Sequence, residues 1–494
     1  MKHNRIKTRL GKVSGISLGD CHMFLGLRFG APPVDERRFM PPVAAGAWQG
    51  TIDATQWPNR AIQSAERGTM GQNTPGERSE DCLFLNIYTP AGTAGPRPVM
   101  VWIHGGGFTA GSANEYDGRV LARQGDVVVV TINYRLGPFG FLNLEPLGKE
   151  FAGSASNGIR DMILALNWVQ QNIADYGGDP QNVTLFGESA GAIAILALFG
   201  APAADNLYQK AIIHSPGAPA VAPGDKTTHM AERLDVERSA LLETLQSMPA
   251  WELLKTNLPN GHEIDGTVVT LPAKQTIEVK GRESVPLIVG TNRTEGTLFT
   301  PPDTQGEDLS HYEQMLPHVA RGVTRGGDTT AYIKGLQATY PDSNAKRLME
   351  QISTDHFRRT AVEVAEVATE AGVGGWLYRF DLDTTIEFRE KKMMAPHACE
   401  MAFTFNAFAD PECHVFTLHD PDATEVRQLA ESWSSTLTRF CHTGDPNGGG
   451  LPLWAPYDGV RRTVMLLDQV CRIAEDPDAI HRQLWTTALS EHSG

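Results

Sequence analysis

The chain has 494 residues, 41% of them apolar, and a formal net charge of −15. This negative charge would be repelled by a phosphate backbone, which excludes nucleic acid as a partner, and the apolar content excludes a disordered protein. The longest uncharged apolar stretch, residues 189–204, contains two glycines and a proline and is shorter than the roughly 20 residues that span a bilayer, so we expect no membrane anchor.

The N-terminal region predicts a basic tail followed by strands at the edge of a sheet. Residues 2–9 contain four lysines and arginines, but Lys12 and two glycines interrupt the apolar run that a signal peptide would need. Residues 12–27 alternate between apolar and polar side chains over short runs, with a turn at residues 19–20. Such alternation is typical of antiparallel strands.

The middle of the chain alternates strand and helix patterns. Continuous apolar runs at residues 99–103 and 127–132 are typical of strands buried on both faces of a parallel sheet. Asn157 is predicted to cap a helix whose apolar residues recur at helical spacing. Further elements are expected as a strand at 183–186, a helix at 190–199, and strands at 211–213, 286–290 and 376–380. This order predicts a mostly parallel, twisted α/β sheet with helices on both faces, whose ligands bind beyond the carboxyl ends of the strands.

Two regions differ from this alternation. Residues 220–285 and 301–370 are more polar and carry helical patterns, for example at 307–320 and 360–371. We expect helical, cap-like insertions rather than separate domains, because no repeat, low-complexity block or charged linker divides the chain. Residues 1–494 are therefore predicted to form one large domain.

The pattern G-x-S-x-G, typical of a nucleophilic serine, occurs twice, at residues 15–19 and 187–191. A nucleophile elbow needs a strand before the serine and a helix after it, so that the hydroxyl is raised above the sheet at a helix N-terminus. Only the second copy has both flanking elements, and its small residues permit a tight turn. Ser189 is therefore the candidate nucleophile, and the first copy indicates an ordinary hairpin.

A glycine-rich segment, His104-Gly105-Gly106-Gly107, follows the apolar run at 99–103 directly. It matches the H-G-G-G loop whose exposed N–H groups stabilise the oxyanion in lipases and esterases. A dinucleotide-binding turn is the competing interpretation, but residues 109–118 do not open a helix and no acidic residue ends the next strand. We therefore expect no nucleotide cofactor.

Several longer segments extend the comparison over nearly the whole chain. They are FLGLRFGAPP at 24–33, EDCLFLNIYTP at 80–90, NYRLGPFGF at 133–141, YGGDPQNVTLFGESAG at 176–191 and GDPNGGGLPLW at 444–454. With these motifs the sequence resembles the type-B carboxylesterases, the cholinesterase-like branch of the α/β-hydrolases, and above all their bacterial p-nitrobenzyl esterases. The resemblance implies the α/β-hydrolase fold and a serine hydrolase.

The remaining triad members follow the serine in the order acid, then histidine. The residues alone leave Glu295 and Asp303 as acids, and His397, His414 and His419 as bases. The resemblance favours Glu295, in the loop GTNRTEG at 290–296, and His397, in PHACEMAFTF at 396–405. In the second segment two alanines replace a glycine and a proline of the family pattern.

The resemblance also suggests roles for residues around the triad. Gly106, Gly107 and the N–H of Ala190 would form the oxyanion hole, while His104 is expected to be structural. Ser215 resembles a serine that supports the family's triad, although a proline follows it where glycine is usual.

The cysteines favour a reduced, cytoplasmic protein. Cys82 lies where secreted relatives form a disulfide, but Ala61-Ile62-Gln63 stands at the expected partner position. None of the six cysteines forms a C-x-x-C pair, so the spacing does not support a zinc or thiol-redox site.

The expected activity is hydrolysis of a small-molecule carboxylic ester through an acyl-serine, without metal or organic cofactor, by a monomer or small homo-oligomer. Amide or carbamate hydrolysis on the same fold remains an alternative, as does a non-catalytic cholinesterase-like binding protein. Apolar side chains near the catalytic positions could line the substrate pocket or belong to the core: Phe108, Leu298, Phe299, Met393, Met394 and Phe403.

Overall fold

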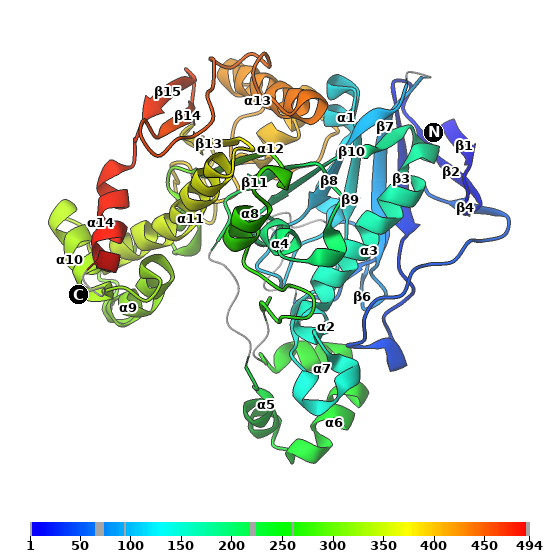
Figure 1. Cartoon of the computed structure of the whole chain (residues 1–494), viewed down its shortest axis with the longest axis horizontal. Coiled ribbons are helices and arrows are strands. Elements are labelled where there is room, and N and C mark those ends of the chain that lie inside the picture. The colour runs from blue at the N-terminus through cyan, green and yellow to red at the C-terminus, as the bar shows by residue number, and fades with distance from the viewer. Residues whose placement is uncertain (1, 65–73, 93–94, 218–223, 259–260, 491–494) are drawn as a thin grey trace.

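The computed structural model describes residues 2–64, 74–92, 95–217, 224–258 and 261–490 (Figure 1). Its centre is a 13-stranded sheet in the order β1-β2-β3-β7-β9-β8-β10-β11-β12-β13-β14-β15, with β4 beside β2. The middle of the sheet, from β9 to β14, is parallel. This is the α/β-hydrolase architecture that the sequence predicts.

The parallel strands have the following bounds: β9 Val128–Ile132, β8 Arg97–Ile103, β10 Gly178–Glu188, β11 Lys210–His214, β12 Leu287–Asn292, β13 Gly375–Phe380 and β14 Thr463–Leu467. The six strand segments predicted between residues 99 and 380 are thus confirmed. Antiparallel strands extend both edges: β1 Lys2–Lys7, β2 Lys12–Ser17, β3 Cys21–Arg28 and β7 Phe84–Pro90 on one side, and β15 Arg472–Glu475 on the other. The strand β4 is Thr51–Asp53, and β5 Arg60–Ala61 pairs with β6 Arg78–Ser79 in a separate two-stranded sheet.

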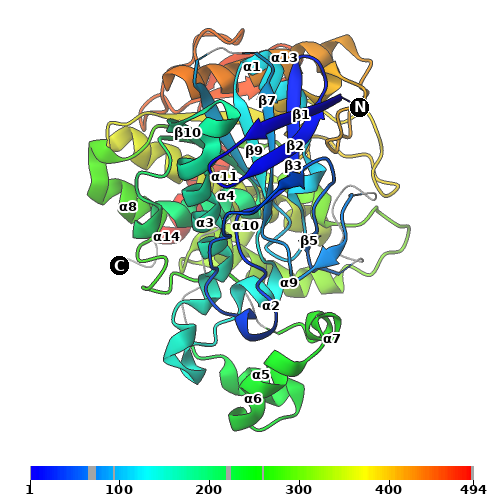
Figure 2. The same cartoon turned by 90° about the vertical axis from the view of Figure 1, so that its right-hand side faces the viewer.

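Helices cover both faces of the sheet (Figures 1 and 2). On one face lie α3 Asn157–Asn172, α4 Ala190–Phe199, α8 Ala273–Lys280 and α11 Ala345–Glu370; on the other lie α1 Arg119–Gly125, α12 Met401–Thr404 and α13 Thr424–Thr443. All residues of β8 are buried, and its side chains alternate between two core clusters, with Val101 in one and Trp102 in the other. This alternation is the period of two that a strand imposes on its side chains.

The helix at α3 begins at Asn157, with Ser156 at the capping position. The prediction that Asn157 caps this helix is therefore wrong. Its side-chain oxygen, the group that a cap would need, instead accepts a hydrogen bond from the guanidinium of Arg160 at 3.2 Å. Its side-chain NH2 donates to the carbonyl oxygen of Phe39 at 2.6 Å, a contact between segments far apart in the chain.

The two regions marked as insertions contain several helices in the part that the structure describes, which excludes residues 220–223 and 259–260. The first contains α5 Thr227–Leu234, α6 Leu241–Ser247, α7 Ala250–Lys255 and α8; its first three helices lie with α2 Gly137–Phe141 below the sheet (Figure 1). The second contains α9 Ser310–Thr324, α10 Thr329–Thr339 and α11, packed with α14 Ala479–Ser490. Within the described residues, no helix is both long and apolar enough to cross a membrane.

Candidate active site

Ser189 lies on a sharp turn between β10 and α4. Its backbone has φ 55° and ψ −120°, a conformation that L-residues seldom adopt, and its N–H donates a hydrogen bond to the carbonyl oxygen of His214 at 3.0 Å. Glycine is required beside it, because a Cβ atom at Gly191 would lie 2.0 Å from the carbonyl oxygen of Ile103. The local sequence thus forces the strand–turn–helix geometry of a nucleophile elbow.

The glycine-rich loop after β8 faces this turn. A Cβ atom at Gly105 would lie 3.1 Å from Cβ of Ser189, and Gly106 and Gly107 have φ values of 99° and 62°. Among the described residues, the N–H groups of Gly106 and Gly107 have no protein acceptor. Ala190 is the first residue of α4, so its N–H has no acceptor within the helix. All three residues line the same cavity as Ser189.

His104, next to this loop, is part of the core. Its ring stacks on Tyr134 with ring centroids 4.4 Å apart, and the hydroxyl of Tyr134 donates a hydrogen bond to the His104 carbonyl oxygen at 2.8 Å. Burial lowers the pKa of the His104 imidazole to about 4. The ring is therefore neutral at physiological pH and serves to hold the loop.

His397 and Glu295 form a close pair at the carboxyl ends of neighbouring strands. Nδ1 of His397 lies 2.5 Å from Oε2 of Glu295, and both side chains are buried. Oε1 of Glu295 accepts hydrogen bonds from the hydroxyl of Ser215 and from the N–H of Asn292, each at 2.6 Å. Hydrogen bonds to His397, Ser215 and Asn292 therefore fix the position of the carboxylate. The other acid considered, Asp303, forms ion pairs with Lys346 and Arg347 near the surface.

Aromatic rings hold the imidazole from the cavity side. The ring centroid of Phe357 lies 4.6 Å from that of His397, and Phe299 lies 5.2 Å away. Of the other histidines considered, His414 lines the cavity, whereas His419 is buried beside Phe403. The structure thus places His397 closest to a carboxylate in the arrangement that a general base requires.

A second carboxylate, which sequence reasoning missed, contacts the same imidazole. Nε2 of His397 lies 2.9 Å from Oε1 of Glu188, in an ion pair whose angles are not those of a hydrogen bond. No hydrogen bond joins Ser189 to His397 among the described residues. Burial lowers the pKa of His397, but the charges of Glu188 and Glu295 outweigh it and hold this pKa well above 6.5. The position of Glu188 directly before Ser189 in the sequence is the feature from which a place near the catalytic residues could have been predicted.

A third buried glutamate completes the acidic environment. Glu400 accepts a hydrogen bond from the side-chain amide of Asn292 at 2.6 Å and from the hydroxyl of Tyr378 at 3.3 Å. Burial and the charges of Glu295 and Glu188 raise the pKa of Glu400 to about 8. The Glu400 carboxyl therefore carries a proton at neutral pH.

Ser189, His397 and the three candidate oxyanion-hole residues line a cavity of 980 Å³, at the upper end of the range of small-molecule sites. Of the apolar residues that the sequence suggested, Phe108, Leu298 and Phe299 line it. Met393, Met394 and Phe403 do not: Met393 and Phe403 are buried in the core, while Met394 is 46% exposed. The pocket prediction is corrected for these three residues, because closeness to His397 in sequence does not decide which way a side chain points.

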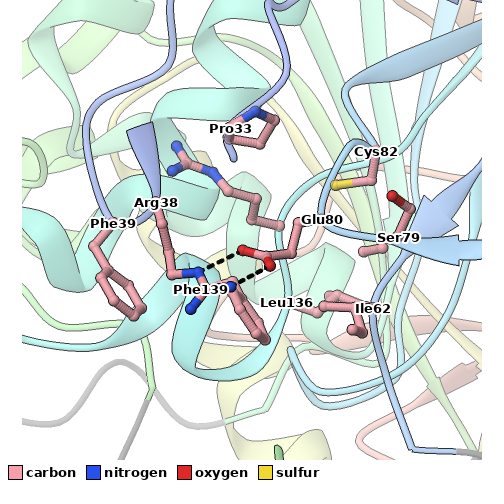
Figure 3. A pocket seen from close by; sticks show the side chains of 11 residues that line it. Pro33, Arg38, Phe39, Ile62, Ser79, Glu80, Cys82, Leu136 and Phe139 are labelled. Carbon is pink, nitrogen blue, oxygen red and sulfur yellow. Dashed lines mark hydrogen bonds and ion pairs between the residues drawn. The ribbon is translucent and has the colours of Figure 1, made fainter. Parts of the chain in front are cut away.

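Figure 3 shows side chains that line a different pocket, Arg38 and Glu80 among them. This pocket has a volume of only 10 Å³. The guanidinium and the carboxylate form a bidentate ion pair with distances of 2.5 and 2.8 Å. A volume this small barely holds one water molecule. It is a packing gap around a structural ion pair rather than a ligand site.

Known proteins are similar to this chain over nearly its whole length. A family model described as the carboxylesterase family matches residues 2–485. The chain belongs to the carboxylesterase family. It is 32% identical to the para-nitrobenzyl esterase of Bacillus subtilis over 98% of each chain, and 34% identical to carboxylesterase 1D of Rattus norvegicus over 88% of this chain and 83% of the relative.

Solved structures of the family have the same fold. A PNB esterase structure superposes with a TM-score of 0.85 at 31% identity and covers 98% of this chain and 99% of its own. A carboxylesterase of Geobacillus stearothermophilus superposes with a TM-score of 0.81 at 31% identity, covering 97% and 99%. This member of the carboxylesterase family is therefore an enzyme that acts on carboxylic ester bonds. Within the part of the chain described, no group of His, Cys, Asp and Glu could hold a metal ion.

Proposed function

We propose that the enzyme hydrolyses small-molecule carboxylic esters through an acyl intermediate on Ser189, with His397 as general base and Glu295 as its orienting acid. One observation carries the proposal: an imidazole bonded to a buried carboxylate lines the same cavity as a serine on a strained elbow. Serine is a weak nucleophile near neutral pH and needs such a base, and the base needs a partner that sets its tautomer.

In the first step, His397 takes the proton of Ser189 as the serine oxygen attacks the ester carbonyl. Its Nε2 faces Glu188 in the structure, so the imidazole must turn from this carboxylate to the hydroxyl. The N–H groups of Gly106, Gly107 and Ala190 then stabilise the oxyanion, and each such donor contributes about 3 kcal/mol in comparable enzymes.

The alcohol leaves after accepting the proton from His397. Water then attacks the acyl-Ser189 ester with the same histidine as base, which releases the acid and restores the serine. Glu295 stabilises the imidazolium that forms in each step. The sequence of steps requires no metal or organic cofactor.

A fluorophosphonate probe tests the nucleophile. The probe should label Ser189, and Ser189→Ala should lower kcat by about six orders of magnitude, as in comparable triads. Ser17, in the other copy of the G-x-S-x-G pattern, provides a matched control because it lies in β2; Ser17→Ala should keep full activity and labelling. Active protein in which Ser189 stays unlabelled would overturn the assignment.

A single domain is part of the same proposal. The candidate residues follow β8, β10, β12 and β13, which are parallel and adjacent or nearly adjacent in the sheet. Because the carboxyl ends of parallel strands meet at one edge, a shorter piece of the chain would lack part of the site.

A further inference from the structure

A second cavity, of 60 Å³, lies next to the catalytic one. Among the described residues that line the two cavities, Ile193 is the one they share. Ile193 lies one helical turn after Ser189, and its N–H donates a hydrogen bond to the Ser189 carbonyl oxygen at 2.9 Å. A single side chain close to the nucleophile therefore stands between the two spaces.

The same two helices form walls of both cavities. On α4, Ile193 is followed by Leu196 and Ala197 in the second cavity, three and four residues on. On α11, His356 lines the catalytic cavity and Val364, eight residues later, lines the second. Residues three, four, seven or eight apart share one face of a helix. The second cavity therefore lies further along the same faces of α4 and α11.

The walls of the second cavity are mostly apolar. The apolar lining residues are Ile193, Leu196, Ala197, Ile264, Val269, Leu271, Pro272, Ala273 and Val364. Charged groups are Lys274, Arg325 and Glu363, of which Arg325 and Glu363 form an ion pair with each other. Leu271 and Lys274 are exposed, so this end borders the surface. The space is several times the roughly 15 Å³ that holds one water molecule.

We propose that the second cavity is a chain-binding subsite for esters with a long unbranched aliphatic chain, and that Ile193 sets the chain length the enzyme accepts. The subsite rests on the proposed function, because the chain must extend from an ester held at Ser189. A chain that passes Ile193 enters apolar surroundings, where each buried methylene raises kcat/KM by up to about fourfold.

A series of p-nitrophenyl esters from acetate to decanoate tests the subsite. Ile193→Ala opens the wall and should raise the ratio of kcat/KM for decanoate to that for acetate by about tenfold or more. Ile195→Ala is the matched control, since it removes the same atoms from the same helix. Ile195 is fully buried in the core and lines neither cavity, so its variant should keep the parent ratio.

A second variant blocks the subsite from its far side. Ala273 lies at the start of α8, is only half-buried, and lines the second cavity alone. Ala273→Phe in the Ile193→Ala background should remove the gain on decanoate and leave acetate turnover unchanged. A parallel series of alkyl acetates distinguishes an acyl chain from an alcohol chain: the end whose length responds to Ile193→Ala occupies the subsite.

The inference would be overturned if, in both series, the ratio of kcat/KM for the longest ester to that for the shortest in Ile193→Ala stayed within twofold of the parent ratio. A gain that survives Ala273→Phe would also overturn it. Either result leaves the proposed function intact as long as the parent enzyme turns over acetate and Ser189 is labelled. Loss of these two properties would instead contradict the proposed function itself.

Discussion

Replacing Glu295 by glutamine removes one charge and keeps the shape of the side chain. The neighbouring hydrogen-bond donors determine the orientation of the glutamine side-chain amide. Its oxygen must take the place of Oε1, because the backbone N–H of Asn292 and the hydroxyl of Ser215 both donate to that position at 2.6 Å. The amide NH2 then faces Nδ1 of His397, where Oε2 lies 2.5 Å away in the parent. Since NH2 only donates, Nδ1 must become the acceptor and the imidazole proton moves to Nε2.

This tautomer cannot act as the base, because Nε2 is the nitrogen that has to receive the proton of Ser189. A wrong tautomer in a comparable serine triad lowers kcat by about four orders of magnitude. The loss corresponds to about 5 kcal/mol of transition-state stabilisation. We therefore expect Glu295→Gln to lower kcat about 10⁴-fold on p-nitrophenyl acetate, with an unchanged melting temperature.

Glu400→Gln provides the matched control. It changes another buried glutamate of the same cluster, but Glu400 is protonated at neutral pH because its pKa is raised to about 8. An amide resembles a protonated carboxyl group, so kcat at pH 7 should fall less than tenfold. A folded Glu295→Gln enzyme that keeps more than a tenth of the parent kcat would refute the tautomer argument.

Two further predictions concern charge. Because the pKa of His397 is held well above 6.5 and only the neutral imidazole can act as base, kcat/KM should fall as the pH drops through this raised pKa. Glu188→Gln removes one of the two raising charges and should move this acid limb to lower pH; an unmoved limb would show that Glu188 does not raise the pKa. For stability, Asp161 pairs with Arg135 at 2.7 Å, with side chains 0% and 2% exposed. Asp161→Ala leaves a buried, unpaired guanidinium and should lower the free energy of unfolding in urea by about 3–5 kcal/mol, whereas a loss below 1 kcal/mol would contradict this.

The elements next to the catalytic residues were predictable from local sequence. The strand–turn–helix at Ser189 depends on neighbours within a few residues, since apolar runs specify the strand and helix and glycines permit the turn. Asn157 shows the limit of local rules. It has the side chain of a helix cap, but its oxygen accepts from Arg160 and its NH2 donates to Phe39, far away in the sequence.

The sequence by itself determined the fold class, because the order of apolar strand and helix patterns along the chain specifies a parallel α/β sheet. It also determined the elbow at Ser189 and the glycine loop after β8, because each depends on residue types within one short segment. The residues alone left two acids and three histidines open. Only the tertiary structure decided that His397 meets Glu295, that Glu188 contacts the same ring, and that Ile193 separates two cavities. These contacts join segments far apart in the chain, and their geometry depends on how strands and helices pack rather than on the residues next to each group.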